Sequence, residues 1–407
     1  MPQQRETIET AAKVVEAARE RLAGLGAAHI ALPARFHFAP VDPVHIANVA
    51  PVPPPDLGPL AAFVGAWQGN GFNTIFRPDS QQTPTPLPIP AGGDNVLELN
   101  LTAESLSFSP SLGSVPNRGM VQGDVFLNGV PYLQAINDVT TGQPVGIHVE
   151  PGIWIAVPST SDPAEPTQTF ARMASIPHGT TINAQGAAST APGAPTIPPV
   201  DITPFFSSSG QRIRFQSQTA AAQGTARIPQ DLTSVPITQA MLDDPNSVLR
   251  DQIAGQHIDS TTTITISTSP PQPLFGGGSD NIAFLLGFPG ATSNPNSPGQ
   301  NAQTLIVNAT FWIETVEHTI VIPPFSKPPT KPIELRPEGH TPGSLAPTFI
   351  VHPPVPIPRP HPITIRTKQI QYSQTVVLNF NGLSWPHVSV ATLVPAHSVP
   401  VTGGWPT

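Results

Sequence analysis

Apolar and polar residues alternate along much of the chain, and alternation with a period of two predicts β-strands. The clearest case is Tyr372–Leu393, where two β-branched runs flank Asn381 and Gly382, which predicts a hairpin of two long strands. Other strand candidates are separated by turn signals, as in an up-and-down antiparallel sheet, so we predict an all-β protein. These candidates are Gly65–Gly71, Asn95–Leu101, Ser105–Phe108, Gly123–Leu127, Tyr132–Asn137, Gly146–Ile155, Phe170–Ile176, His257–Ser269, an apolar strand within 274–288, and Thr304–Ile322.

One strand candidate has an unusually bare face. Gly65, Trp67, Gly69, Gly71 and Asn73 are two residues apart and therefore point the same way. Glycine weakens a strand unless a bulge, a tight barrel bend or the close approach of another group requires it. The pattern predicts either an antiparallel β-barrel closed at one end by the indole or a bent strand with a core tryptophan.

A helical period appears at the start of the chain. Apolar residues at three-and-four spacing predict a helix over Arg5–Gly24. This helix has three interpretations: docking on the main domain, pairing with a partner helix in a homo-oligomer, or lying on a membrane. Its polar face mixes Glu with Lys and Arg, which weighs against the membrane. Shorter helical turns are expected within 238–253, with Thr238 as a cap and Pro245 as a break.

Changes in composition divide the chain into three parts. Residues 1–55 form the N-terminal helix and a proline-rich arm, 56–397 the β-barrel domain, and 398–407 a C-terminal tail. Two insertions are expected within the barrel domain. The first, 187–256, is mixed polar and helical, and the second, 323–362, is proline-rich and expected to be extended without regular structure.

Composition and charge exclude several functional classes. Only 11% of the 407 residues are charged and the formal net charge is −8, so a basic surface for nucleic acid is not expected. There is no cysteine, which excludes disulfides, thiolate catalysis and cysteine metal sites. The first residues resemble no secretory leader, and no apolar run approaches the ~20 residues of a membrane helix, so we expect a soluble cytoplasmic protein.

His387 is the main candidate for chemistry. It begins the second strand of the predicted hairpin and shares a face with Ser389, Ala391 and Leu393. Pro386 removes a hydrogen-bond donor and restricts Trp385 to extended or turn geometry, which fixes the place of the histidine. An imidazole held in apolar surroundings suits a metal or haem ligand. A half-buried histidine hydrogen-bonded to its neighbours is the simpler interpretation of the strand alone.

A second candidate lies in the segment 146–155. His148, Glu150, Gly152 and Trp154 share one face of this strand, and apolar residues share the other. His148 and Glu150 are placed for joint contact with a water, a metal or a ligand. A polar outer face over an apolar inner face explains the pattern equally well, so the sequence leaves open which face is inside.

Two further side chains are weaker candidates. His178 lies between Pro177 and Gly179, in a turn that either aims its ring into a cavity or leaves it in solvent. Arg118 is one of few charges in its region, and it is expected either to bind a carboxylate or propionate or to clamp a neighbouring loop.

Three short motifs, in order along the chain, resemble the nitrobindins, a family of haem-binding β-barrels related in shape to lipocalins and other calycins. GAWQGNG at 65–71 resembles the family's GxWxGxG strand, GIHVEPGIWI at 146–155 its HxExG strand, and WPHVSVATL at 385–393 its C-terminal strand with the axial histidine. The segment after GNG is shorter than in the family, with Thr74 and Ile75 at its Thr-Ile place. The segments between the motifs are then insertions or a second lobe.

The resemblance implies a calycin-like barrel that binds haem b, with His387 as the iron ligand. It further implies that Trp67 closes the barrel, that Gly69 and Gly71 leave room for the macrocycle, and that Trp385 helps to hold His387 in register. Binding of a small reactive nitrogen or oxygen species at ferric haem, with isomerisation of peroxynitrite to nitrate, is the activity the resemblance implies.

Three alternatives remain. The barrel is expected to bind an apolar small molecule without a metal if His387 is only hydrogen-bonded. The chain is expected to be a structural or assembly protein if the N-terminal helix and the proline-rich segments dominate. A non-haem metal site formed by His148, Glu150 or His178 is the last alternative.

Overall fold

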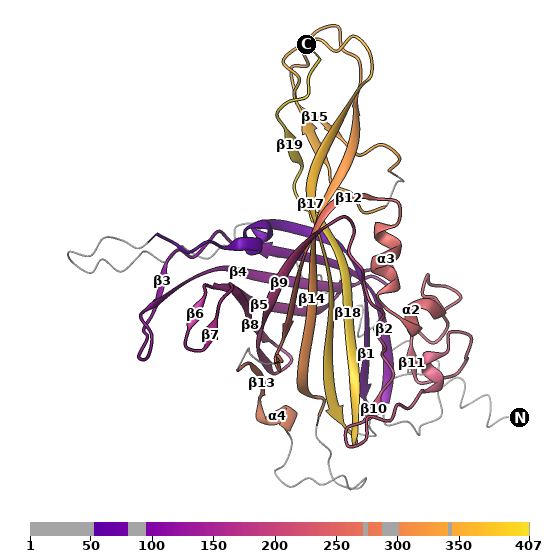
Figure 1. Cartoon of the computed structure of the whole chain (residues 1–407). Helices are drawn as coiled ribbons and strands as arrows, with labels where there is room; N and C mark the ends of the chain where they lie inside the picture. The colour runs from indigo at the N-terminus through magenta and orange to yellow at the C-terminus, as the bar shows by residue number, and fades with distance from the viewer. Residues whose placement is uncertain (1–52, 80–94, 272–275, 287–300, 341–343, 407) are drawn as a thin grey trace, which may run out of the picture.

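The structure is a computed structural model that describes residues 53–79, 95–271, 276–286, 301–340 and 344–406. In these residues, ten antiparallel strands close into a barrel (Figure 1), which confirms the predicted all-β class. Closure follows from β1, which pairs with both β18 and β2, and from the pairing of β2 with β4. The barrel strands, in their order around the barrel, are β1 Gly65–Pro78, β2 Asn95–Phe108, β4 Val125–Asp138, β5 Val145–Val157, β8 Thr169–Ile176, β9 Thr180–Pro192, β12 His257–Ser267, β14 Gln303–Ile322, β17 His361–Phe380 and β18 Leu383–Pro395.

The predicted hairpin is confirmed as β17 and β18, which pair from Ile370–Leu393 to Phe380–Leu383. Asn381 and Gly382 both have positive φ, which the tight turn requires. Two predicted breaks are wrong, because Asn95–Phe108 and Val125–Asp138 are each one continuous strand. Polar side chains interrupt the apolar pattern there because some face a polar barrel interior.

A cluster of aromatic rings fills the barrel towards the start of β1. Phe63 of the 3₁₀ helix η1 (Gly58–Phe63) stacks on Phe108, with ring centroids 4.7 Å apart, and contacts Trp154 and Phe311. Trp67 is buried beside it and donates its indole N–H to the Phe63 carbonyl at 2.7 Å. Trp67 therefore closes this part of the barrel together with η1. The predicted helix Arg5–Gly24 lies outside the described residues.

The segment between β9 and β12 covers part of the outer wall of the barrel. It contains β10 (Phe205–Phe206), η2 (Gln216–Gln218), β11 (Arg227–Ile228), α2 (Gln239–Asp243) and α3 (Ser247–Ile253). Thr238 caps α2 as predicted, since its hydroxyl accepts from the Met241 amide at 3.3 Å. Phe215 reaches the wall and packs against Phe76 and Trp385. Strands beneath this segment consequently bury both of their faces.

A second lobe stands on the long ends of β14 and β17 (Figure 1). Its sheet consists of β15 (Ile333–Leu335), β16 (Phe349–Val351) and β19 (Val399–Val401). The expectation that 323–362 has no regular structure is wrong, because short apolar runs between the prolines pair as strands. The lobe has a core of its own, made of Ile320, Ile322, Phe349, Val351, Ile357 and Ile363.

Short elements complete the described chain. They are β3 (Val115–Asn117), β6 (Thr160–Ser161), β7 (Ala164–Glu165), β13 (Gly278–Asn281) and α4 (Ala283–Leu286). The apolar strand predicted within 274–288 is therefore only partly right, since its apolar part is a helical turn. No helix among the described residues is long and apolar enough to cross a membrane.

Candidate functional site

A cavity of about 380 Å³ lies inside the barrel, on the far side of the aromatic cluster from η1. Its volume falls in the range of small-molecule sites, which are concave and mostly apolar with a few polar groups. Aliphatic side chains from six elements line much of it, and three histidines and one arginine also reach it. Its lining includes Asn73, Ile75, Ile136, Ile147, His148, Arg172, Ile176, His178, Thr180, Leu285, Phe311, Tyr372, Gln374, Val376, Leu378, His387 and Ser389.

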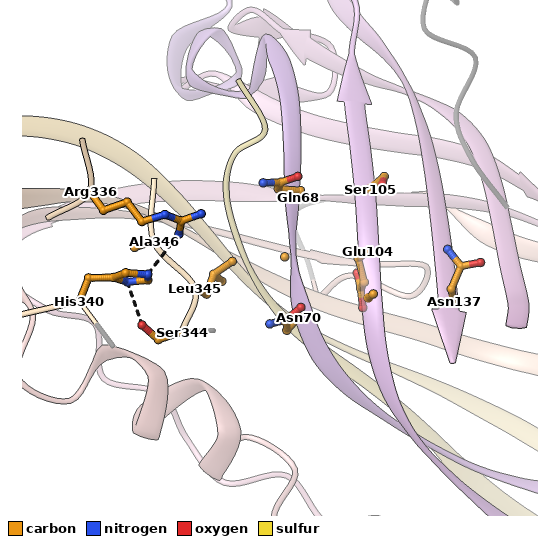
Figure 2. A pocket seen from close by; sticks show the side chains of 12 residues that line it. Gln68, Asn70, Glu104, Ser105, Asn137, Arg336, His340, Ser344, Leu345 and Ala346 are labelled. Atoms are coloured by element: carbon orange, nitrogen blue, oxygen red, sulfur yellow. Dashed lines mark hydrogen bonds between the residues drawn. The ribbon is translucent and has the colours of Figure 1, made fainter. Parts of the chain in front are cut away.

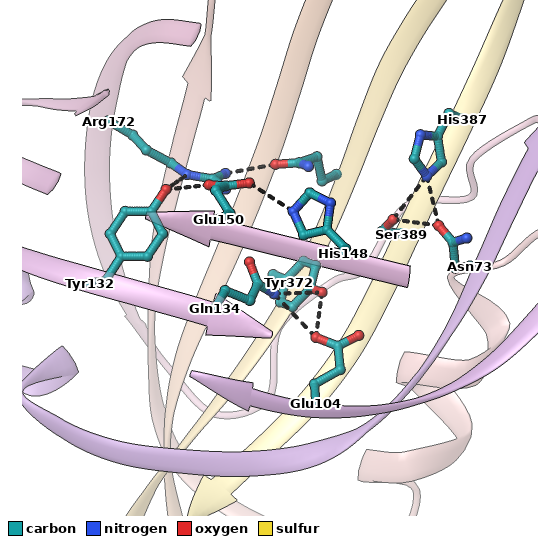
Figure 3. A network of polar contacts seen from close by, with 11 residues as sticks. Asn73, Glu104, Tyr132, Gln134, His148, Glu150, Arg172, Tyr372, His387 and Ser389 are labelled. Carbon is teal, nitrogen blue, oxygen red and sulfur yellow. Dashed lines mark hydrogen bonds and ion pairs between the residues drawn. The ribbon is translucent and has the colours of Figure 1, made fainter. Parts of the chain in front are cut away.

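His387 enters the cavity from β18, beside β1. Its Nε2 lies 2.7 Å from Asn73 Oδ1 and 3.4 Å from the Ser389 hydroxyl (Figure 3). Ser389 and Asn73 face each other across the paired strands, so the register of β1 and β18 creates this contact. Burial, together with the nearby His148 and His178, lowers the pKa of His387 to about 3. The imidazole is therefore neutral at physiological pH, the form that binds metals.

His148 and Glu150 lie on the inner face of β5, which the sequence left open. Glu150 is fully buried and contacts His148 at 3.2 Å, and it also forms an ion pair with Arg172 and a hydrogen bond with the Tyr132 hydroxyl (Figure 3). Burial alone would raise the pKa of Glu150, but Arg172 and the hydrogen bonds outweigh it and hold the pKa well below its usual value. Glu150 is thus an anion inside the barrel.

The glycine of the same motif has a steric role. A Cβ atom on Gly152 would lie 2.5 Å from the Tyr132 ring. That is far inside van der Waals contact, so only glycine lets the ring lie over β5. The ring position in turn lets the Tyr132 hydroxyl reach Glu150, which explains the spacing of the HxExG motif in this chain.

Arg172 is the buried cation of the site. Its three nitrogens donate to Tyr132 at 2.8 Å, to Gln374 Oε1 at 2.6 Å and to Glu150. Its guanidinium also lies 5.5 Å from the centre of the Phe311 ring. All three nitrogens already have partners on the protein.

His178 lies in the turn between β8 and β9, at the edge of the cavity. Its ring stacks on His148 with centroids 5.6 Å apart and planes inclined by 25°. Burial and the neighbouring His148 lower its pKa. The structure therefore places His148, His178 and His387, from three separate elements, around one cavity.

A second polar group lies deeper in the barrel. The buried Glu104 accepts from the Tyr372 hydroxyl at 2.6 Å, from Gln134 at 3.2 Å and from Thr102 at 2.9 Å. Burial raises its pKa despite these three bonds. Glu104 also lines a surface cleft of about 690 Å³, which the loop bearing Arg336 and His340 partly covers (Figure 2).

Several predicted site residues do not line the cavity. Gly69 and Gly71 are covered by the backbone of β18, since a Cβ on them would lie 1.9 Å from the Thr392 carbonyl oxygen and 2.1 Å from that of Val390. The close approach of another group, here the neighbouring strand β18, therefore accounts for these glycines. Trp67 belongs to the aromatic cluster described above.

Trp385, Thr74 and Arg118 also lie elsewhere. Trp385 stacks on Phe380 at 4.6 Å and packs under the outer-wall segment. Thr74 is buried, but of the predicted Thr-Ile pair only Ile75 lines the cavity. Arg118 is exposed and pairs with Asp124 of its own loop rather than with a neighbouring loop.

Sequence reasoning missed four residues that define the site: Asn73 as a partner of His387, and Arg172, Tyr132 and Tyr372 as the buried polar groups. Two signals were available. Arg172 is the one charged residue in the strand Thr169–Ile176, and the chain has only two tyrosines, both of which lie here. Neither signal reveals which residues meet.

Comparisons with known proteins add little. No family model matches the chain, and no curated protein is significantly similar to it. Among solved structures, it is similar to "Crystal Structure of Rv2717c from M. tuberculosis", with 9% identity, a TM-score of 0.31, and coverage of 84% of this chain and 97% of that one. A similarity of this size carries no functional argument.

Proposed function

We propose that the barrel binds a small, largely apolar molecule in its interior cavity, with haem b as the leading candidate and His387 as the iron ligand. The observation that carries the proposal is a neutral, half-buried imidazole that lines a cavity of small-molecule size. Neutral imidazole is the usual protein ligand of haem iron.

The residues around His387 fit a haem group at the position of its iron. His387 Nδ1 makes no hydrogen bond to any described residue, so one ring nitrogen is available. Ile75, Val376 and Leu378 supply apolar walls beside it. Bound ferric haem would supply a Lewis-acidic iron for a small reactive nitrogen or oxygen species, and His148 and His178 are the polar side chains near which such a ligand would lie.

The paired charges of the interior support a neutral or weakly polar ligand body. Arg172 and Glu150 neutralise each other, and Glu98 of the cavity lining pairs with Arg77. Burial raises the pKa of Glu104, which favours its neutral form. A ligand therefore enters a cavity that demands no compensating charge. Burial of its apolar surface is the main source of affinity.

Titration of the purified protein with haemin tests the proposal. We expect a Soret band with a position typical of histidine ligation, and we expect His387→Ala to lose that band. His397→Ala is the matched control, because His397 is exposed and is not among the lining residues. The absence of a Soret shift in the wild-type protein would reject the haem assignment.

One observation favours a second candidate, metal-free binding of an apolar molecule. His387 Nε2 already has partners in Asn73 and Ser389, so the histidine is satisfied on one side without a metal. A fluorescent apolar probe such as 1-anilinonaphthalene is expected to bind in the cavity in either case. Competition by haemin identifies the shared site, whereas probe binding without any haemin effect favours the metal-free function.

A further inference from the structure

A short chain of amide and hydroxyl contacts surrounds His387. Asn73 Nδ2 donates to Asn100 Oδ1 at 3.0 Å, and Asn73 Oδ1 lies 2.7 Å from both the Ser389 hydroxyl and His387 Nε2. Asn73 and Asn100 are buried and directly opposite each other on β1 and β2. The contacts among Asn73, Asn100 and Ser389 thus link three neighbouring strands.

The chemistry of these atoms constrains the proton on the imidazole. In this arrangement Asn73 Oδ1 only accepts, so a 2.7 Å contact requires His387 Nε2 to carry a hydrogen. A ring turned over by 180° would place a carbon against this oxygen instead. The Ser389 hydroxyl donates to the same oxygen and does not compete for the proton.

The surroundings of the other ring nitrogen, Nδ1, also favour a hydrogen on Nε2. Nδ1 has no hydrogen-bond partner among the described residues, and in Figure 3 no contact reaches it. The Nδ1–H form would place two acceptors, His387 Nε2 and Asn73 Oδ1, 2.7 Å apart and would leave the ring N–H without a partner among the described residues. The Nε2–H form pairs the ring N–H with Asn73 Oδ1 and leaves only an acceptor, Nδ1, without a partner there.

We infer that Asn73 is a positioning residue that holds His387 in the Nε2–H tautomer, so that the cavity meets the lone pair of Nδ1. The inference rests on the proposed function only in taking this cavity as the ligand site. It narrows the ligand class to molecules that bring either a metal ion or a hydrogen-bond donor to Nδ1. An apolar molecule with only acceptor groups has no partner at this position.

Long-range ¹H–¹⁵N correlation spectra of the full-length, ligand-free protein with ¹⁵N-labelled histidine test this inference at neutral pH. The His387 signals are assigned by their loss in His387→Ala. We expect the Nε2–H pattern in the wild type and in Asn73→Asp, because a carboxylate oxygen accepts in the same place. Asn73→Leu removes the acceptor, and we expect it to shift His387 towards a mixture of tautomers.

Haemin affinity gives a second readout. We expect Asn73→Leu to weaken it by about tenfold, the lower end of the effect of losing a residue that orients a metal ligand. Asn70→Leu is the matched control, since it makes the same change at an exposed position of β1, and it is expected to leave both spectrum and affinity unchanged.

An Nδ1–H pattern in the wild type would overturn the inference, and so would an unchanged His387 pattern in a folded Asn73→Leu. Where Asn73→Leu fails to fold, the wild-type and Asn73→Asp spectra still decide. The two proposals fail separately. Lack of a Soret band with the Nε2–H pattern present rejects haem binding alone, and a Soret band with an Nδ1–H pattern rejects the role of Asn73 alone.

Discussion

The inner and outer faces of the barrel wall bury their charged groups in different ways. Inside, Arg172 and Glu150 form an ion pair completed by Tyr132 and Gln374. Outside, beneath the segment between β9 and β12, the Glu314 carboxyl accepts from Gln369 at 2.6 Å, while its other oxygen has no partner among the described residues. Glu150 thus stays charged because Arg172 pairs with it, whereas burial raises the pKa of Glu314 to about 8, so that acid is neutral at pH 7.

The buried arginine of the outer segment shows a further contrast. Arg227 is fully buried and organises its loop by donating to backbone carbonyls rather than to a carboxylate. Those carbonyls belong to Ser217, Thr219, Ala220, Ala222, Pro229 and Gln230. The outer segment therefore depends on hydrogen bonds to one side chain, whereas the interior cavity contains a balanced ion pair.

The largest effect is expected from breaking the inner pair. Arg172→Met leaves the Glu150 anion buried without its cation, so we expect the free energy of unfolding to fall by about 3–5 kcal/mol. Urea unfolding followed by tryptophan fluorescence measures it. The double variant Arg172→Met/Glu150→Gln is expected to recover part of the loss, and equal stability of single and double variants would show that the pair does not hold the inner face.

An intermediate effect is expected at Glu314, and it depends on pH. Its pKa is about 8 in the folded protein and near its ordinary value when unfolded, so the unfolded chain releases the proton first as pH rises. Wild-type stability therefore declines between about pH 5 and pH 8, by at most about 1.4 kcal/mol per pH unit from this group. Glu314→Gln removes that contribution and becomes progressively more stable than the wild type across this window.

Thermal or urea unfolding at several pH values measures this difference. Glu338→Gln is the control, because Glu338 is exposed. The pKa of Glu104 is also raised, so Glu104 contributes to the decline of stability with pH as well. That contribution remains in both Glu314→Gln and Glu338→Gln. Parallel stability curves for wild type and Glu314→Gln would contradict a neutral buried acid on the outer face.

The smallest effect is expected from the exposed pair of Arg118 and Asp124. Solvent screens this contact, so Arg118→Ala is expected to leave the unfolding midpoint unchanged. It is also expected to leave haemin binding unchanged, since Arg118 does not line the cavity. A marked loss of stability would show that charge pairs matter at the surface of this protein as much as inside it.

Much of the fold was predictable because it follows from local pattern. Period-two alternation located most barrel strands, and Asn381-Gly382 specified the β17–β18 hairpin through its positive φ angles. The glycines at 69 and 71 correctly indicated a close approach, which the neighbouring strand β18 makes. The short apolar runs between the prolines of 323–362 were wrongly expected to lack regular structure. They form strands whose pairing partners lie in distant segments, as β16 and β19 do.

The sequence by itself determined the strands, their turns and a set of chemically capable side chains, because these depend on residues a few positions apart. Only the tertiary structure decided which face of β5 is inside, since the inner face carries His148 and Glu150 while Ile153 and Ile155 lie on the outer one, the reverse of the usual pattern. It alone brought Asn73 to His387 across 314 positions of the chain and gathered three histidines around one cavity. Contacts of that kind depend on barrel closure and strand register, which no local pattern encodes.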